Sequence, residues 1–187
     1  MAVEEPKFTL VKEDGDLQIR DYPELVVAEV AVGGDRRQAS SDGFRLLAGY
    51  IFGGNAGRNS IAMTAPVRQA PHQGSKIAMT APVAVVGGPG KWMVQFSMPS
   101  EYTLANLPKP NDERVKLRVL PPMRTAVLKF SGLTGDARVA TKTEKLISLL
   151  SDHGLRSTGD VSLARYDPPW TPWFMRRNEL MVPIAHN

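Results

Sequence analysis

The sequence predicts an α+β fold in which one sheet packs against two helices. The main observation is an internal repeat, offset by 98 residues (115 − 17), in which strand-like and helix-like patterns recur in the same order. The second is an ordinary globular composition: 187 residues, of which 42% are hydrophobic and 22% are charged. A chain of this length buries roughly 70% of its unfolded surface, enough for one core without disulfide bonds. We therefore expect a single domain over residues 1–187.

The long repeat aligns residues 17–34 with residues 115–132. Identical residues recur at four matching places: Arg20 and Arg118, Pro23 and Pro121, Ala28 and Ala126, Gly34 and Gly132. Each block has the pattern of a strand, a proline turn and a second strand with alternating apolar residues. A helix candidate follows each block. The chain is therefore expected to form two β-α-β halves, over about 7–98 and 110–184, related by a pseudo-twofold axis.

The two helices are expected over about residues 35–52 and 136–153. Asp35 and Asp136 stand where N-caps are needed, and glycine follows each segment. The i, i+3, i+4, i+7 spacing predicts the core face of the first helix. That face is expected to hold Phe44, Leu47, Ala48 and Ile51.

A shorter repeat, the heptad IAMTAPV, occurs at residues 61–67 and again at 77–83. Apolar and β-branched residues on either side of a turn-rich stretch predict two neighbouring strands. Met63 and Met79 occupy equivalent positions of the heptad. We expect both to be buried on the inner side of the sheet, as core filling rather than as metal ligands. A further strand is expected over residues 92–96, where apolar and polar residues alternate.

Composition excludes several classes of site. The chain has no cysteine, so it has no disulfide, thiolate metal site or cysteine nucleophile. Three histidines without an HExxH motif argue against a zinc hydrolase. No GxSxG, GxxxxGK[ST] or GxGxxG motif stands in the right context. We therefore do not predict an enzyme, although an enzyme acting on a tetrapyrrole stays open as a third alternative.

Charge and hydropathy limit the classes of partner that the sequence predicts. The net charge of +4 comes from scattered lysines and arginines rather than a dense basic run, so no nucleic-acid partner is predicted. No stretch approaches about 18 apolar residues, so no membrane span is predicted. The acidic start lacks the apolar core of a signal peptide, and a cytoplasmic location is expected, with a removed leader left open. A protein partner is also left open.

Near the C-terminus, residues 166–179 are rich in proline, aromatic residues and arginine. One interpretation is a loop that tucks its rings into the core and leaves its arginines in solvent. The other is a binding site: an apolar wall with guanidinium groups at its rim suits a flat ligand that bears carboxylates. On the first helix, Gly49 has two interpretations: a tolerated cost in helix propensity, or room for something flat to lie against the helix with Arg45 beside it.

These residues belong to longer strings that match a known family. The strings are GYIFGGN at 49–55, both IAMTAPV copies, MPSEYTL at 98–104 with LPKPN at 107–111, and RYDPPW at 165–170 running on to Asn178 and Glu179. On these residues the chain resembles the SOUL/haem-binding protein family, almost throughout from Phe8 to Val182. The resemblance implies a duplicated unit forming a twisted, barrel-like, mostly antiparallel sheet flanked by two helices, similar also to GyrI-like effector-binding domains.

The resemblance also implies a ligand. Family members bind haem or related tetrapyrroles non-covalently in a hydrophobic surface groove, for carriage or buffering. The groove lies between the first helix and the C-terminal strand pair with its loop. Carried onto this sequence, its helix side is Asp42, Arg45, Leu46 and Gly49, and its loop side is Trp173, Phe174, Met175, Arg176 and Arg177. At Gly49 the chain departs from the animal haem-binding proteins, which carry a bulkier residue there.

An axial ligand is less clearly indicated. Haem iron takes His, Met, Cys or Tyr. His72 lies in the loop between the two IAMTAPV copies, where it is either simply solvated or able to swing in as an axial ligand. His153 has a sufficient role at a helix end, where a cation is favoured by the dipole. Tyr50 and Tyr166 are weaker candidates. The alternative function is a GyrI-like effector-binding or protein-interaction module without specific haem binding.

Overall fold

The computed structural model describes residues 4–71, 90–168 and 170–185. Its strands are β1 (Thr9–Asp14), β2 (Leu17–Tyr22), β3 (Leu25–Gly34), β4 (Val67–Pro71), β5 (Gly90–Ser97), β6 (Lys116–Leu120), β7 (Met123–Ser131), β8 (Ser162–Arg165) and β9 (Arg177–Pro183). Its helices are α1 (Arg36–Ile51), α2 (Asp136–Asp152) and the short 3-10 helix η1 (Trp173–Met175). The α+β prediction is confirmed. No helix among the described residues is long and apolar enough to cross a membrane.

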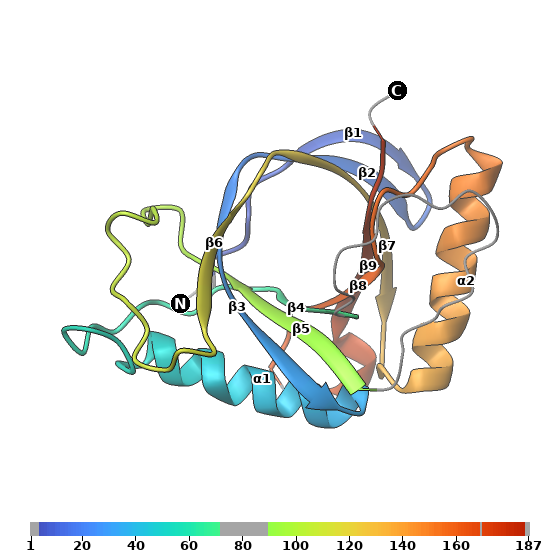
Figure 1. Ribbon diagram of the computed structural model, residues 1–187. Coiled ribbons are helices and arrows are strands. Elements are labelled where there is room, and N and C mark those ends of the chain that lie inside the picture. The colour runs from blue at the N-terminus through green and yellow to red at the C-terminus, as the bar shows by residue number, and fades with distance from the viewer. Residues whose placement is uncertain (1–3, 72–89, 169, 186–187) are drawn as a thin grey trace.

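All nine strands form one antiparallel sheet in the order β1-β2-β7-β9-β8-β4-β5-β3-β6. The sheet curves strongly, but it does not close, and β1 and β6 are its edges (Figure 1). The barrel-like shape expected from the family resemblance is therefore an open, curved sheet. Both helices pack on its outer side, α1 against β3 and β5, and α2 against β7 and β9.

The alternation of side chains divides each strand between two environments. On β9, Leu180 and Val182 point to the helix side, where they join the core beneath α2. Glu179 and Met181 point to the opposite side, which we call the concave face because it lies inside the curve of the sheet. A second core, around Leu47, lies beneath α1. The helix side therefore holds the two main cores, and the concave face is free to hold polar groups.

The two halves of the chain have matching topologies. When β2, β3, β4 and β5 are matched with β6, β7, β8 and β9, every pairing among these eight strands has a counterpart. The pairs are β2 with β7 and β6 with β3, β3 with β5 and β7 with β9, and β4 with β5 and β8 with β9. The pairing of β4 with β8 is its own counterpart. The proline turns at Pro23 and Pro121 separate the strands as predicted. The internal duplication itself stays a prediction.

The helix ends agree closely with the predictions, with one difference. Asp35 caps α1 by accepting a hydrogen bond from the Gln38 backbone N–H at 2.8 Å. The N-cap of α2 is Gly135, however, and not Asp136. Asp136 instead lies in the first turn, where its charge favours the helix dipole and binds Arg36 at 2.7 Å. This pair joins the N-termini of the two helices.

The predicted core face of α1 is partly wrong. The buried residues are Ala39, Gly43, Leu47, Tyr50 and Ile51. Phe44, which was expected in the core, is 40% exposed, although its ring lies 5.5 Å from that of Phe96. The reason is Gly43: an added Cβ would lie 2.5 Å from Val94, so the helix approaches β5 along its glycine. This approach turns Phe44 to the flank.

The prediction of a strand over residues 61–67 is wrong. Only Val67 belongs to a strand, the start of β4. The preceding residues are fixed by other bonds: Ile61 N–H donates to Ile51 O and Ala65 N–H to Glu4 O, both outside the sheet ladder. Pro66 has no N–H to contribute to a ladder. Met63 is only partly buried and packs against the α1 core, and the second copy with Met79 lies outside the described residues.

Candidate functional site

The loop between β8 and β9 carries a group of exposed apolar side chains. Trp173, Phe174 and Met175 of η1 are 58%, 60% and 64% exposed, and Trp170 is 83% exposed. The loop starts beside α1, because Arg165 at the end of β8 donates a hydrogen bond to the Ser40 hydroxyl. It ends beside β7, where Gly132 N–H donates to Arg176 O at 3.2 Å. The rings therefore lie in solvent and not in the core.

Helix α1 also presents an apolar stripe to solvent. Phe44, Ala48 and Phe52 follow one another at i, i+4 and i+8, so they share one flank of the helix. Phe52, the C-cap, is 66% exposed. Ser40 lies next to Phe44 on the flank that meets Arg165. We call the exposed apolar residues of α1 and of the loop the α1–loop surface; they are Phe44, Phe52, Trp170, Trp173, Phe174 and Met175.

The predicted helix-side residues lie further round α1. At about 100° per residue, Arg45 and Gly49 lie roughly 100–180° round the axis from Ser40 and Phe44. Arg45 pairs with Asp42 at 3.5 Å on the outside of the helix, and Leu46 packs at the margin of the α1 core. Nothing lies within 4 Å of a Cβ added to Gly49, so the space above this glycine is open. These residues therefore lie on a different side of α1 from the flank that meets the start of the loop.

The two neighbouring arginines at the end of the loop are separated. Arg176 stays in the loop, where its Nε donates to Thr171 O at 2.9 Å. Arg177 begins β9, and strand alternation turns it to the concave face. There its guanidinium binds both carboxylate oxygens of Glu5, at 2.8 and 3.2 Å, and lies 3.6 Å from the centre of the Tyr166 ring. The structure therefore does not bring Arg177 together with Arg45 and Gly49.

On the concave face, a buried ion pair joins β2 to β9. Arg20 and Glu179, at 2% and 0% exposure, form two parallel hydrogen bonds of 2.9 Å. Burial alone would lower the pKa of Arg20, but the hydrogen bonds and charge of Glu179 outweigh it and raise this pKa. The Tyr166 hydroxyl donates to Glu179 at 2.5 Å, and Arg20 donates to the Tyr22 hydroxyl at 3.0 Å. Burial raises the pKa of both tyrosines, so both hydroxyls are neutral at neutral pH.

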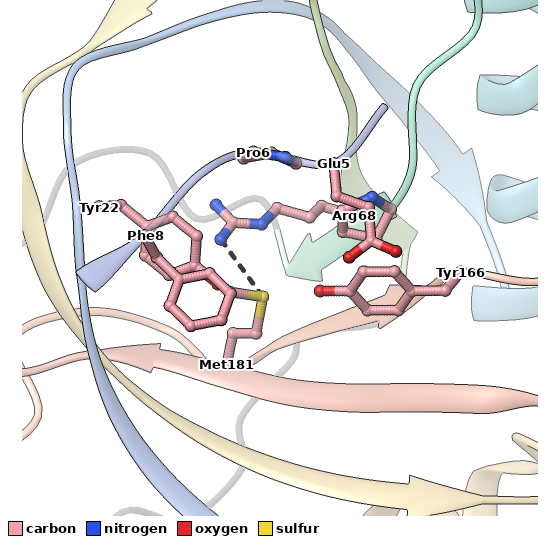
Figure 2. A pocket seen from close by; sticks show the side chains of 8 residues that line it. Glu5, Pro6, Phe8, Tyr22, Arg68, Tyr166 and Met181 are labelled. Carbon is pink, nitrogen blue, oxygen red and sulfur yellow. Dashed lines mark hydrogen bonds between the residues drawn. The ribbon is translucent and has the colours of Figure 1, made fainter. Parts of the chain in front are cut away.

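A small cavity lies against this ion-pair cluster (Figure 2). Its volume is about 10 Å³, room for roughly one water molecule. It is lined by Glu5, Pro6, Phe8, Tyr22, Pro66, Arg68, Tyr166 and Met181. Figure 2 shows the Arg68 side chain extending between Tyr22 and Tyr166, with Pro6 on one side and Met181 on the other. The N-terminal residues Glu5–Phe8 thus cover an arginine-rich part of the concave face.

Sequence reasoning missed this cluster, although two signals were present. Arg20 and Glu179 are charged residues inside otherwise apolar strands, which is uncommon unless the charges are paired. Arg20 also recurs as Arg118 in the long repeat. Their pairing depends on a sequence separation of 159 residues, so it was not visible in the local pattern.

Few groups in the described residues are placed to ligate a metal. No cluster of three or more His, Asp or Glu side chains occurs there. His153 caps α2, and its Nε2 lies 3.3 Å from Asp14, on the far helix from the α1–loop surface. The Tyr50 and Tyr166 hydroxyls donate to Pro108 O and to Glu179. His72 lies outside the described residues, so its suggested axial role stays a prediction.

The chain was compared with known protein families, curated proteins and solved structures. A family model described as SOUL heme-binding protein matches residues 3–183. No curated protein matches the chain. Among solved structures, the C-terminal domain of EcmrR is similar with a TM-score of 0.66 and 13% identity, over 91% of this chain and 98% of that domain.

Two further structures have lower scores. A hydrolase from Listeria innocua has a TM-score of 0.58 and 13% identity, over 94% of each chain. SAV2435, solved with bound tetraphenylphosphonium, has a TM-score of 0.51 and 12% identity, over 90% of this chain and 93% of that one. At such identities the similarity shows the fold alone, which is that of GyrI-like effector-binding domains.

Proposed function

The chain belongs to the SOUL haem-binding protein family, and from this premise we propose that it binds haem or a related tetrapyrrole non-covalently. The proposed role is carriage or buffering of the ligand, and no catalysis is proposed. The proposed binding region is the α1–loop surface with its rim at Arg45, Gly49 and Arg176. The observation that supports this region most directly is the exposure of Trp173, Phe174 and Met175, each more than half exposed.

The chemistry of the surface suits the ligand. Exposed large apolar side chains gathered on one loop favour a binding site, because they are costly to leave in water. A porphyrin offers a broad apolar face to the rings, and its two carboxylates suit guanidinium groups at the rim. The open space above Gly49 admits a flat group against the helix. Haem would supply the iron and the ring, whereas the protein would supply the apolar walls and the cationic rim.

Hemin titrations, followed by the Soret absorbance of the full chain, test the proposal. Arg176→Ala is expected to weaken hemin binding by about 1.5–3 kcal/mol, the scale of a charge-assisted hydrogen bond. Arg177→Ala is the matched control, because this neighbour points to the concave face. Its hemin affinity is expected to equal that of the parent.

A steric variant tests the helix side. Gly49→Trp is expected to abolish hemin binding while leaving the fold intact, since the position is open. Ser148→Trp places the same ring on an exposed position of α2 and is expected to leave binding unchanged. Equal hemin affinity in the parent, Arg176→Ala and Gly49→Trp would place the ligand elsewhere or exclude specific haem binding.

The fold itself supports a second candidate function. The chain has the fold of GyrI-like effector-binding domains, and SAV2435 of similar fold binds tetraphenylphosphonium. The alternative is therefore a small-molecule effector or protein-interaction module without specific haem binding. A parent protein that develops no saturable Soret change with hemin, yet is stabilised by another small molecule, would favour this candidate.

A further inference from the structure

We propose that the concave face carries a second binding site, for a small molecule with an aromatic ring and a carboxylate, and that residues Glu5–Phe8 now occupy this site as an internal ligand. The site lies on the opposite side of the sheet from the helices. It is therefore distinct from the α1–loop surface proposed for haem.

The charges around the cavity do not balance. Three guanidinium groups, from Arg20, Arg68 and Arg177, meet two carboxylates, from Glu5 and Glu179. Glu179 is fully buried and already engaged by Arg20 and Tyr166. The excess positive charge favours an anionic ligand over a cationic one.

Arg68 is the guanidinium without a carboxylate. Its side chain donates to the Met181 sulfur at 3.2 Å and lies 5.6 Å from the centre of the Tyr22 ring. Among the described residues it forms no ion pair with an acid. Burial lowers its pKa, which reflects the cost of removing this cation from water. An oxyanion bound there would give the guanidinium the bidentate partner that it lacks.

Residues Glu5–Phe8 already place the two required groups on the site. The Glu5 carboxylate binds Arg177 through both oxygens. The Phe8 ring lies 4.2 Å from the Arg20 guanidinium and 5.5 Å from the Tyr22 ring. A carboxylate and an aromatic ring, three residues apart, therefore rest on two arginines. A ligand that carries both a carboxylate and an aromatic ring could therefore make the same two contacts.

The covering segment is irregular and lies at the surface. Residues Glu5–Phe8 belong to no helix or strand, and all except Pro6 are exposed. The cavity left beneath them, about 10 Å³, is too small for any organic ligand. A ligand must therefore displace Glu5 and Phe8, place its ring near Tyr22 and its carboxylate between Arg68 and Arg177. Competition with the segment then limits the ligand's affinity.

Fluorescence titration of the full chain with 2-naphthoate tests the proposal. We expect saturable binding at one site, and no comparable binding of the neutral 2-naphthalenemethanol. Glu5→Gln removes the competing carboxylate and is expected to tighten 2-naphthoate binding about three- to tenfold. Glu144→Gln, which makes the same charge change on an exposed position of α2, is expected to leave binding unchanged.

Arg68→Met tests the anion contact itself. It is expected to weaken 2-naphthoate binding at least about tenfold. Its thermal midpoint is expected to equal or exceed that of the parent, because a partly buried cation without an acidic partner is removed. Should this variant fail to fold, Arg68→Lys keeps the charge without the bidentate geometry, and it is expected to weaken binding too.

Three results would overturn the proposal. The first is the absence of saturable 2-naphthoate binding in both the parent and Glu5→Gln. The second is unchanged affinity in whichever Arg68 variant folds. The third is equal binding of the neutral alcohol, which would show that the carboxylate is not recognised.

Discussion

At the scale of single residues, the buried ion pair Arg20–Glu179 places the strictest demand on its hydrogen-bond partners. A buried pair offsets its desolvation cost only when each charge is well bonded. Here Glu179 accepts from Arg20 and from Tyr166, and Arg20 also donates to Gln18. The pair therefore depends on every member of the network.

Removing one partner of this pair is predicted to be strongly destabilising. Glu179→Gln leaves Arg20 buried without a counter-charge, which costs about 3–5 kcal/mol of unfolding free energy. The double variant Arg20→Met with Glu179→Leu is expected to recover most of the loss, because it removes both charges. Urea unfolding measures both. Asp112→Asn, in an exposed pair with Arg114, is the control and is expected to change little. A single variant as stable as this control would contradict the prediction.

The buried side chain of Tyr50 makes the stability of the fold depend on pH. Its hydroxyl donates to Pro108 O at 2.9 Å, and burial raises its pKa from 10.0 to about 12, with Tyr102 contributing. Between these values the unfolded chain releases a proton that the folded chain keeps. The stabilising contribution is therefore complete below about pH 10 and is lost as the pH rises toward 12.

The measurable consequence is the slope of the unfolding free energy against pH. The unfolding free energy of the parent is expected to fall between pH 10 and 12, and that of Tyr50→Phe to fall less steeply, because phenylalanine does not ionise. Tyr22 and Tyr166 contribute in the same direction to both proteins. Urea titrations at a series of pH values measure the slopes, and parallel slopes would contradict the assignment to Tyr50.

At the scale of elements, α1 contains two glycines with opposite roles. Gly43 faces β5, where a Cβ would lie 2.5 Å from Val94 Cγ2, whereas Gly49 faces open space. Gly43→Ala is expected to cost about 1–3 kcal/mol through overpacking. Gly49→Ala is expected to stabilise the protein by up to about 1 kcal/mol through helix propensity. Urea unfolding of both variants checks this, and effects of the same sign would contradict it.

The elements themselves were largely predictable, but the candidate site was predictable only in part. The bounds of α1 and α2 lie within one residue of expectation, since capping and periodicity are local signals. Loop residues Trp173–Met175 are exposed, so they do not fill the core, and their binding role stays a prediction. The flank taken by Phe44 and the separation of Arg176 from Arg177 were not predictable, because close packing and strand alternation decide them.

At the scale of the whole molecule, the two halves depend on each other. Three of the sheet pairings, β2 with β7, β3 with β6 and β4 with β8, join one half to the other. Separating the halves would remove one strand neighbour from each of β2, β3, β4, β7 and β8, and it would leave β6 with none. Each half would also lose the side-chain contacts that cross these pairings, including the pair Arg20–Glu179.

Cutting the chain between Leu104 and Ala105, in the connection between β5 and β6, is therefore expected to give two fragments that do not fold alone. Mixing them is expected to restore a folded complex, because all the pairing partners are then present. Circular dichroism with thermal unfolding of each fragment and of the mixture measures this. A cooperative transition in either isolated fragment would contradict the interdependence, although it would be compatible with the proposed duplication.

The sequence by itself determined the fold class, the approximate bounds of both helices, the proline turns and the family. Each of these rests on residues that are close together in the chain or on strings long enough to be recognised. Tertiary structure alone decided that Arg20 meets Glu179, that Arg177 turns away from Arg176, and that Glu5 and Phe8 cover the concave face. The physical reason is that the register of β2, β7 and β9 and the curvature of the sheet bring together side chains whose separations along the chain no local pattern encodes.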